Sequence, residues 1–277
     1  MDDLIICVAP YPSEHQSEKF PGRMDVDEEV IRCHASGASI AHLHVRDEDG
    51  NQVPDTRWFA RDVRRIKEAC PIIIEGSTGG APEHTLAQRC VSFTVPGVDM
   101  GSLNLGSINM FGGVFQNSWS DMRYYAGELK KRGLMPFLDC FDLSHFNSVP
   151  RLEREGLLEP PYVFGLVFDT PDTLPYSDRH LEVFVEELPA RSTWFLTRHQ
   201  PAGSRGFLKA VEMGGHVRVG FENGPFLTDG TKARSNAQLV DDIVEAAQRV
   251  GRKVVGPDRA REIMGLPPRS RVGAGAS

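Results

Sequence analysis

Eight short runs of β-branched and apolar residues alternate with longer segments of helical composition along this 277-residue chain. The runs lie at 4–9, 39–45, 71–76, 98–103, 135–141, 162–168, 192–197 and 216–222. Such alternation is typical of parallel strands joined by crossover helices. Eight units favour a closed (β/α)₈ barrel over an open doubly wound sheet, because no Gly-x-Gly-x-x-Gly turn follows the first run. We predict one (β/α)₈ TIM barrel domain over 1–277, with a frayed C-terminal tail from about residue 268.

Composition narrows the class of partner. With 40% hydrophobic and 25% charged residues the chain can bury a large core, and its net charge of -7 creates no general attraction for nucleic acid or an anionic membrane. Its start is acidic and no apolar stretch approaches the length of a membrane span. The 5 cysteines include no Cys-x-x-Cys pair, which argues against a disulfide framework. These features predict a cytoplasmic protein that acts on small molecules.

His42 and His44 form the sharpest local signal. Residues i and i+2 of a strand point to one face, and these two histidines lie near the end of the second predicted strand. In a (β/α)₈ barrel the C-terminal ends of the strands form the active-site face. Two imidazoles together there indicate a metal site, with zinc as the metal that such ligands suit.

A third protein ligand is expected, because catalytic zinc sites take three and leave one position open. Glu222 and Glu75 both end predicted strands. Glu222 is favoured because the eighth strand lies one strand away from the second around a closed barrel. Arg218, four residues earlier, is predicted to point to the same face as Glu222, where it must meet a carboxylate or a ligand.

The segment Gly76-Ser77-Thr78-Gly79-Gly80 follows the third predicted strand. Its backbone N–H groups, with the Ser77 and Thr78 hydroxyls as donors, could hold an anion. Glycine-rich turns of this kind also occur for steric reasons alone. No lysine completes a P-loop pattern, so nucleotide binding is not indicated.

Several motifs occur together in a fixed order. They are AHLHVRD (41–47), STGG (77–80), SLNLGS (102–107), FDLSH (141–145), GGHVRVGFENG (214–224), SNAQLVDDIV (235–244) and REIMGL (261–266). In this order they resemble the β-keto acid cleavage enzymes, the family typified by 3-keto-5-aminohexanoate cleavage enzyme. The resemblance covers nearly the whole chain, and the ordered set is far more specific than any one motif.

The resemblance implies a zinc-dependent barrel enzyme with one zinc per chain, in which a β-keto acid and the co-substrate acetyl-CoA exchange parts to give acetoacetate and an acyl-CoA. It also implies a homo-oligomer, with a tetramer as one option. Zinc would be held by His42, His44 and Glu222. Substrate contacts would come from Ser77 and Gly80 at the carboxylate, from Glu14 at the variable end, and from Asn104.

Two departures from the family pattern concern proton transfer. Arg218 stands where the family has an arginine that takes the proton with help from a carboxylate. Where the family usually has Gly-Leu-Glu-Asp, this chain has Asn223 in place of the aspartate. Where the family usually has Pro-Glu-Leu-Glu, this chain has Pro-Phe-Leu-Asp, with Asp139 as the last residue of the motif. An amide cannot accept a proton at neutral pH. We therefore expect Asp139 to complete the relay with Arg218, and expect Asn223→Asp to raise activity if its carboxylate can reach Arg218.

Two other functions remain open at this stage. One is a zinc-dependent hydrolase or aldolase on the same barrel, which would need no CoA. The other is a catalytically degenerate member that only binds a small carboxylate. Substrate choice is expected to depend on loops after the strands, such as Glu14, Phe111 and 170–176. Phe111, and the absence of a basic cluster near Glu14, favour a small or apolar substrate tail over an anionic one.

Overall fold

The computed structural model describes residues 3–12, 25–81, 83–199 and 206–268. Glu14 and the predicted frayed tail beyond Pro268 lie outside these ranges. The placement of Glu14 at the substrate and the fraying of the tail therefore stay predictions.

Eight parallel strands close into a barrel, which confirms the predicted (β/α)₈ fold. Neighbouring strands pair in the order β10-β11-β2-β3-β4-β5-β8-β9, so the first and last strands of the set meet. The strands are β2 (Ile6–Val8), β3 (Ile40–Leu43), β4 (Ile73–Gly76), β5 (Met100–Asn104), β8 (Met135–Cys140), β9 (Tyr162–Phe168), β10 (Ser192–Arg198) and β11 (His216–Val219). Each lies within, or within one residue of, a predicted run.

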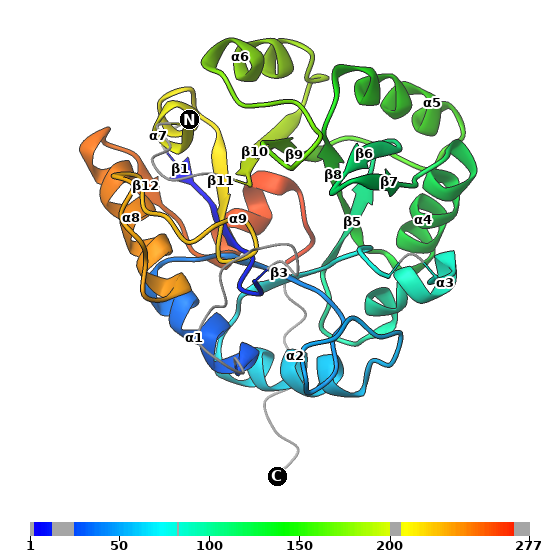
Figure 1. Ribbon diagram of the computed structural model, residues 1–277, viewed down its shortest axis with the longest axis horizontal. Helices are drawn as coiled ribbons and strands as arrows, with labels where there is room; N and C mark the ends of the chain where they lie inside the picture. The colour runs from blue at the N-terminus through cyan, green and yellow to red at the C-terminus, as the bar shows by residue number, and fades with distance from the viewer. Residues whose placement is uncertain (1–2, 13–24, 82, 200–205, 269–277) are drawn as a thin grey trace.

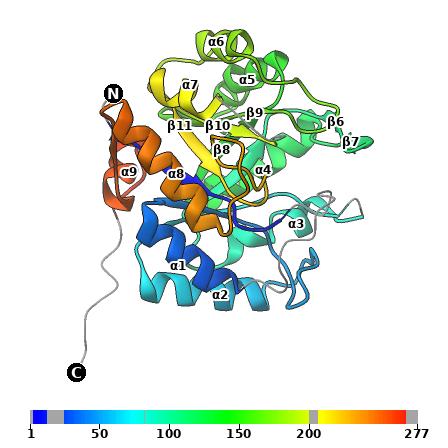
Figure 2. The same cartoon turned by 60° about the vertical axis from the view of Figure 1, so that its left-hand side comes forward.

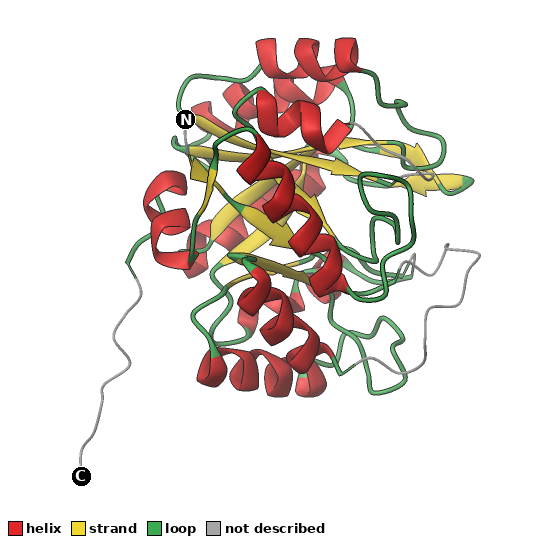
Figure 3. Ribbon diagram, turned by 90° about the vertical axis from the view of Figure 1, so that its left-hand side faces the viewer, coloured by secondary structure: helices red, strands yellow, loops and turns green. Residues whose placement is uncertain are grey.

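Helices surround this barrel, as Figures 1 and 3 show. They are α1 (Val26–Ser36), α2 (Arg57–Ala69), α3 (Leu86–Arg89), α4 (Trp119–Arg132), α5 (Ser148–Arg154), α6 (Asp178–Glu186), α7 (Gly206–Glu212), α8 (Asn236–Arg249) and α9 (Pro257–Met264). No helix in the described ranges has the length and apolar character needed to cross a membrane.

The core has two parts. A large apolar cluster lies between the strands and the outer helices, and a second fills the lower barrel, where Ile40, Ile73, Phe137 and Phe195 meet. Residues of α9, among them Met264, pack against this second cluster. Helix α9 therefore closes the N-terminal end of the barrel and leaves the opposite end for the site.

Besides two 3₁₀ helices and the two-residue strand β12 (Lys253–Val254), which pairs with β1 (Asp3–Leu4), the sequence prediction missed a hairpin and a helix. A hairpin of β6 (Ile108–Met110) and β7 (Gly113–Phe115) follows β5, and Figure 2 shows it projecting at the end of the molecule opposite α9. Helix α7 lies between β10 and β11. Both are short, so neither offers the long periodic pattern by which helices and strands are found in a sequence.

A histidine in the barrel floor predicts how stability depends on pH. His216 is 1% exposed, its Nδ1 accepts a hydrogen bond from the Ile5 amide at 3.1 Å, and burial lowers its pKa to about 3. The unfolded chain binds a proton near pH 6.5, whereas the folded chain does not, so stability falls as pH drops below 6.5.

We expect His216 to lower the free energy of unfolding by about 2 kcal/mol between pH 7 and pH 5, because about 1.36 kcal/mol is lost for each of the roughly 1.5 pH units below 6.5. Chemical denaturation of the wild type and of His216→Asn at both pH values measures this, since the amide oxygen can replace Nδ1 but does not titrate. An equal loss in both proteins would show that His216 is not the cause.

Candidate active site at the barrel mouth

Alternation along the strands places polar side chains above the apolar floor. On β3, Ile40 belongs to the floor and His42 lies one level higher; on β8, Phe137 and Asp139 repeat this order. A cavity of about 440 Å³ opens at the C-terminal ends of the strands and is lined by residues from most of them. This is the face on which (β/α)₈ enzymes carry their active sites.

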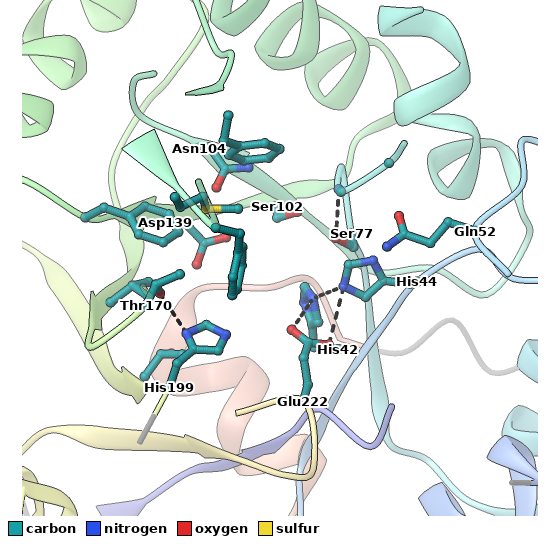
Figure 4. Close-up of a pocket in the computed structure, with 18 of the residues that line it drawn as sticks. His42, His44, Gln52, Ser77, Ser102, Asn104, Asp139, Thr170, His199 and Glu222 are labelled. Atoms are coloured by element: carbon teal, nitrogen blue, oxygen red, sulfur yellow. Dashed lines mark hydrogen bonds and ion pairs between the residues drawn. The ribbon is translucent and has the colours of Figure 1, made fainter. Parts of the chain in front are cut away.

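His42, His44 and Glu222 meet at this mouth, as the sequence predicted. The two Nε2 atoms lie 3.3 Å apart, and the Glu222 carboxylate lies 3.6 Å from Nε2 of His42 and 3.3 Å from Nε2 of His44 (Figure 4). One ligand atom from each residue falls within 4.8 Å of the others, so the three could hold a metal ion. The imidazoles and Arg218 outweigh burial and keep the pKa of Glu222 well below its ordinary value.

Glu75 is the partner of His42 on its other side. Its carboxylate is fully buried and lies 2.9 Å from Nδ1 of His42, which leaves Nε2 directed toward His44 and Glu222. Burial alone would lower the pKa of His42, but the carboxylates of Glu75 and Glu222 raise it. A carboxylate behind a metal-binding histidine commonly fixes the ring and its tautomer. From the sequence, Glu75 was considered only as a metal ligand, less favoured than Glu222.

Glu222 reaches the site from a turn, whereas the sequence placed it within the eighth strand. Strand β11 ends at Val219, and Gly220 follows with φ 139°. A Cβ at Gly220 would overlap the backbone of Ala9, so only glycine lets the chain leave the barrel wall so close to its neighbour. The Glu222 amide then donates to the Ala9 carbonyl at 3.2 Å, which anchors the turn.

Arg218 contacts two carboxyl groups, those of Glu222 and Asp139, beside His42 and His44. Its guanidinium donates to Glu222, and its Nη1 lies 4.0 Å from Oδ1 of Asp139. Burial disfavours its charge, but these carboxylates raise the pKa of Arg218 above the ordinary value. Burial raises the pKa of Asp139 to about 7, against the opposing effect of Arg218. Gly165 leaves the space for this arrangement, because a Cβ there would lie 2.6 Å from Oδ1 of Asp139.

Asn223 contacts a residue that the sequence analysis did not select. Its side-chain nitrogen lies 3.4 Å from Nε2 of His199, whose Nδ1 lies 2.8 Å from the Thr170 hydroxyl. His199 and Thr170 line the cavity, while Asn223 lies behind them. The usable sequence signal was the run of polar residues at the end of the seventh strand, Thr197-Arg198-His199, which is where barrel enzymes carry functional groups.

The glycine-rich turn is divided between two roles. Ser77, Gly79 and Gly80 line the cavity, whereas Thr78 is fully buried and its hydroxyl faces Ser102. Asn104 lines the cavity and also donates to the Thr78 hydroxyl at 3.3 Å. The predicted direct substrate contact by Thr78 is thus not favoured by its position, since the hydroxyl supports the turn from behind.

Buried Arg89 fastens this turn to the hairpin segment. Its guanidinium donates to the carbonyls of Thr78 and Gln116 at 3.0 and 2.9 Å, and to the Asn117 side chain at 3.0 Å. Phe115 lies over its face, 4.8 Å from ring centroid to guanidinium carbon. The turn that would hold the substrate carboxylate and the hairpin that borders the cavity are therefore held in one arrangement.

Comparison with known proteins gives consistent relatives. Residues 3–266 match the family described as beta-keto acid cleavage enzyme. The chain is 35% identical to a 3-keto-5-aminohexanoate cleavage enzyme of Fusobacterium nucleatum, over 96% of this chain and 99% of the relative. It is 30% identical to a 3-oxoadipate:acetyl-CoA acetyltransferase of Cupriavidus necator, over 87% of each chain.

Solved structures agree on the fold. The apo structure of ObcA aligns with a TM-score of 0.70 at 19% identity, over 87% of this chain and 64% of that one. The chain thus spans less than two thirds of the ObcA chain. Its ternary complex with a C4-CoA adduct and oxalate aligns similarly, with a TM-score of 0.71.

Fold and site together define a (β/α)₈ barrel enzyme with a His-His-Glu group at its catalytic face. The chain belongs to the beta-keto acid cleavage enzyme family. Its relatives are named as a cleavage enzyme and as acetyl-CoA transferases, and the protein is accordingly an enzyme of the acyltransferase or lyase class that cleaves carbon–carbon bonds.

Proposed function

We propose that this protein is a zinc-dependent enzyme that condenses a β-keto acid with acetyl-CoA to give acetoacetate and an acyl-CoA. The observation that carries the proposal is the convergence of His42, His44 and Glu222 in the cavity of a family member, directly beside Arg218 and Asp139. Relatives named as 3-oxoadipate:acetyl-CoA acetyltransferase and 3,5-dioxohexanoate:acetyl-CoA acetone transferase support acetyl-CoA as the co-substrate.

The donor set and the local charge both suit a divalent cation. Two imidazole nitrogens and one carboxylate are ligands that zinc prefers, and Glu75 orients His42 from behind. Around this centre the described residues place three carboxyl groups, Glu75, Glu222 and Asp139, against the Arg218 guanidinium. A buried excess of negative charge is costly, and a bound cation would neutralise it.

The residues of this chain divide the reaction between them. When bound, zinc would supply Lewis-acid polarisation of the keto group and a template for the substrate. Ser77 and Gly80 are proposed to hold the substrate carboxylate. Arg218, kept cationic by its carboxylate partners, would stabilise the negative charge that develops when the carbon between the two carbonyl groups loses its proton.

We assign to Asp139 the role of accepting the proton that the substrate carbon loses. An arginine base would have to lose a proton that Glu222 and Asp139 stabilise, so the electrostatics of this mouth disfavour Arg218 in that role. Asp139 lines the cavity and has a pKa raised to about 7, so near neutral pH it can both accept and return a proton. The position of Asn223 against His199 gives no support to a relay through that residue.

Product analysis tests the reaction itself. We expect the purified protein, incubated with β-keto acids and acetyl-CoA, to form acetoacetate and the matching acyl-CoA, detected by mass spectrometry, and to form neither when acetyl-CoA is omitted. Cleavage that proceeds equally without acetyl-CoA would favour a hydrolase or aldolase. Binding without turnover across a broad panel would favour a carboxylate-binding protein.

Metal content tests the ligand assignment. We expect about one zinc per chain by elemental analysis, and its loss in His42→Ala and His44→Ala, because a site with two protein ligands binds weakly. Glu75→Gln should keep the ligands but weaken zinc binding about 10- to 100-fold, since the ring orientation is less well fixed. His34→Ala, on α1 and away from the mouth, is the matched control. Unchanged zinc in both ligand variants would refute the site.

Kinetics of Asp139 variants test the proton assignment. Asp139→Asn should lower kcat by about 10²- to 10⁴-fold with zinc content unchanged, because the amide cannot accept a proton. For the wild type, kcat/KM should rise with pH through about 7 as the carboxyl group ionises. Exposed Asp142 lies three residues along the chain, and Asp142→Asn is the control. A fully active Asp139→Asn protein would exclude Asp139 as the base.

A further inference from the structure

The hairpin β6–β7 forms a fixed wall over one half of the cavity. Phe111 at its tip has φ 53°, and its amide donates to the Pro171 carbonyl at 3.2 Å. The Gly112 amide donates to the Asp172 carboxylate at 2.7 Å. These bonds fasten the hairpin tip to the segment that follows β9, so the Phe111 side chain is held at the cavity.

His199 continues this wall from the end of β10. Its ring lies 6.4 Å from that of Phe111 at 89°, and both rings line the cavity. Figure 4 shows His199 across the cavity from His42 and His44, with Thr170 at its Nδ1. Its two nitrogens face a hydroxyl and an amide, Thr170 and Asn223, neither of which carries charge.

The charged groups around His199 leave its imidazole uncharged. Burial lowers its pKa to about 4, Arg218 and His42 act in the same direction, and Glu222 and Asp169 oppose them. The imidazole is therefore uncharged at neutral pH. The nearby cations have their own partners: Arg218 contacts Glu222, and Arg198 lies 2.6 Å from Asp169.

The remaining groups of this half are mostly apolar. Met110, Phe141 and Val167 are apolar, and the Thr170 and Thr197 side chains add hydroxyl groups that carry no charge. A carboxylate brought here would meet no cation among these described wall residues and would lie on the same side of the cavity as Asp139. Burying an unpaired charge is much more costly than burying an uncharged group.

We propose that Phe111 and His199 are specificity-determining residues that make this half of the cavity accept an uncharged substrate tail and reject an anionic one. This inference rests on the proposed function and deepens it, since it names β-keto acids with uncharged tails as the substrate class. The tail would lie between the Phe111 ring and the imidazole, near the uncharged hydroxyl groups of Thr170 and Thr197.

Three six-carbon acids that differ in tail charge test the proposal: 3-oxohexanoate (uncharged), 3-oxoadipate (anionic) and 3-keto-5-aminohexanoate (cationic). Each is measured for kcat/KM with acetyl-CoA, and for Kd by calorimetry without it. We expect 3-oxohexanoate to exceed 3-oxoadipate by at least about 100-fold in kcat/KM, and to exceed the cationic acid as well. A preference for either charged tail in both measurements would overturn the inference.

Variants of His199 identify the cause. His199→Arg should lower the ratio of kcat/KM for 3-oxohexanoate to kcat/KM for 3-oxoadipate at least about tenfold, because a cation then faces the tail. His199→Phe should keep the wild-type order of the three acids. His34→Arg carries the same substitution outside the cavity and should leave the kcat/KM and Kd values of the three acids unchanged. Circular dichroism and zinc content show that each variant is folded.

The kcat/KM and Kd measurements together distinguish a failure of the proposed cleavage reaction from a failure of the specificity inference. An unchanged ratio in a folded His199→Arg protein would refute the role of His199. Absence of turnover with a preserved Kd order would refute the cleavage reaction and leave the specificity inference standing. Turnover of all three acids at equal rates, with equal Kd values, would refute the specificity inference and leave the reaction standing.

Discussion

The contact between Arg218 and Glu222 organises the mouth of this barrel. Burying an ion costs several kcal/mol unless a partner compensates it, so neither group would be stable there alone. Glu222 lies on a turn beyond β11, and its contact with the guanidinium holds the carboxylate against His42 and His44. On its other side Arg218 faces Asp139, which fits only because Gly165 has no side chain. Replacing Arg218 would leave the two buried carboxyl groups without the cation that they share.

This network is possible because the barrel separates apolar and charged layers along the same strands. Ile40, Ile73 and Phe137 fill the floor together with α9, and the next inward positions are His42, Glu75 and Asp139. The floor supplies the burial free energy that positions the strands, while the layer above can carry groups that oppose folding by themselves. Rigid strands below and adjustable loops above are the arrangement that (β/α)₈ enzymes share.

Sequence patterns predicted the parts that depend on local period. The eight strands and the pair His42 and His44 follow from alternation along short apolar runs, and Glu222 was placed correctly beside them through the order of strands in a closed barrel. Contacts between distant elements were not predictable in this way. Glu75 behind His42 and His199 against Asn223 depend on which strand ends meet in space. The inward position of Thr78 depends on Ser102, whose strand is distant in sequence.

The amide at Asn223 is consistent with an uncharged His199. A carboxylate at this position would face Nε2 of the imidazole and favour its protonated form, as a neighbouring acid does for any histidine. That would place an additional ion pair directly behind Glu222, in a mouth that already contains three carboxyl groups and Arg218. The Asn223 amide can instead form a hydrogen bond with Nε2 of a neutral imidazole. The Thr170 hydroxyl lies at hydrogen-bond distance from Nδ1 of the same ring. With an amide at this position, the His199 part of the cavity wall stays uncharged beside the His42, His44 and Glu222 group.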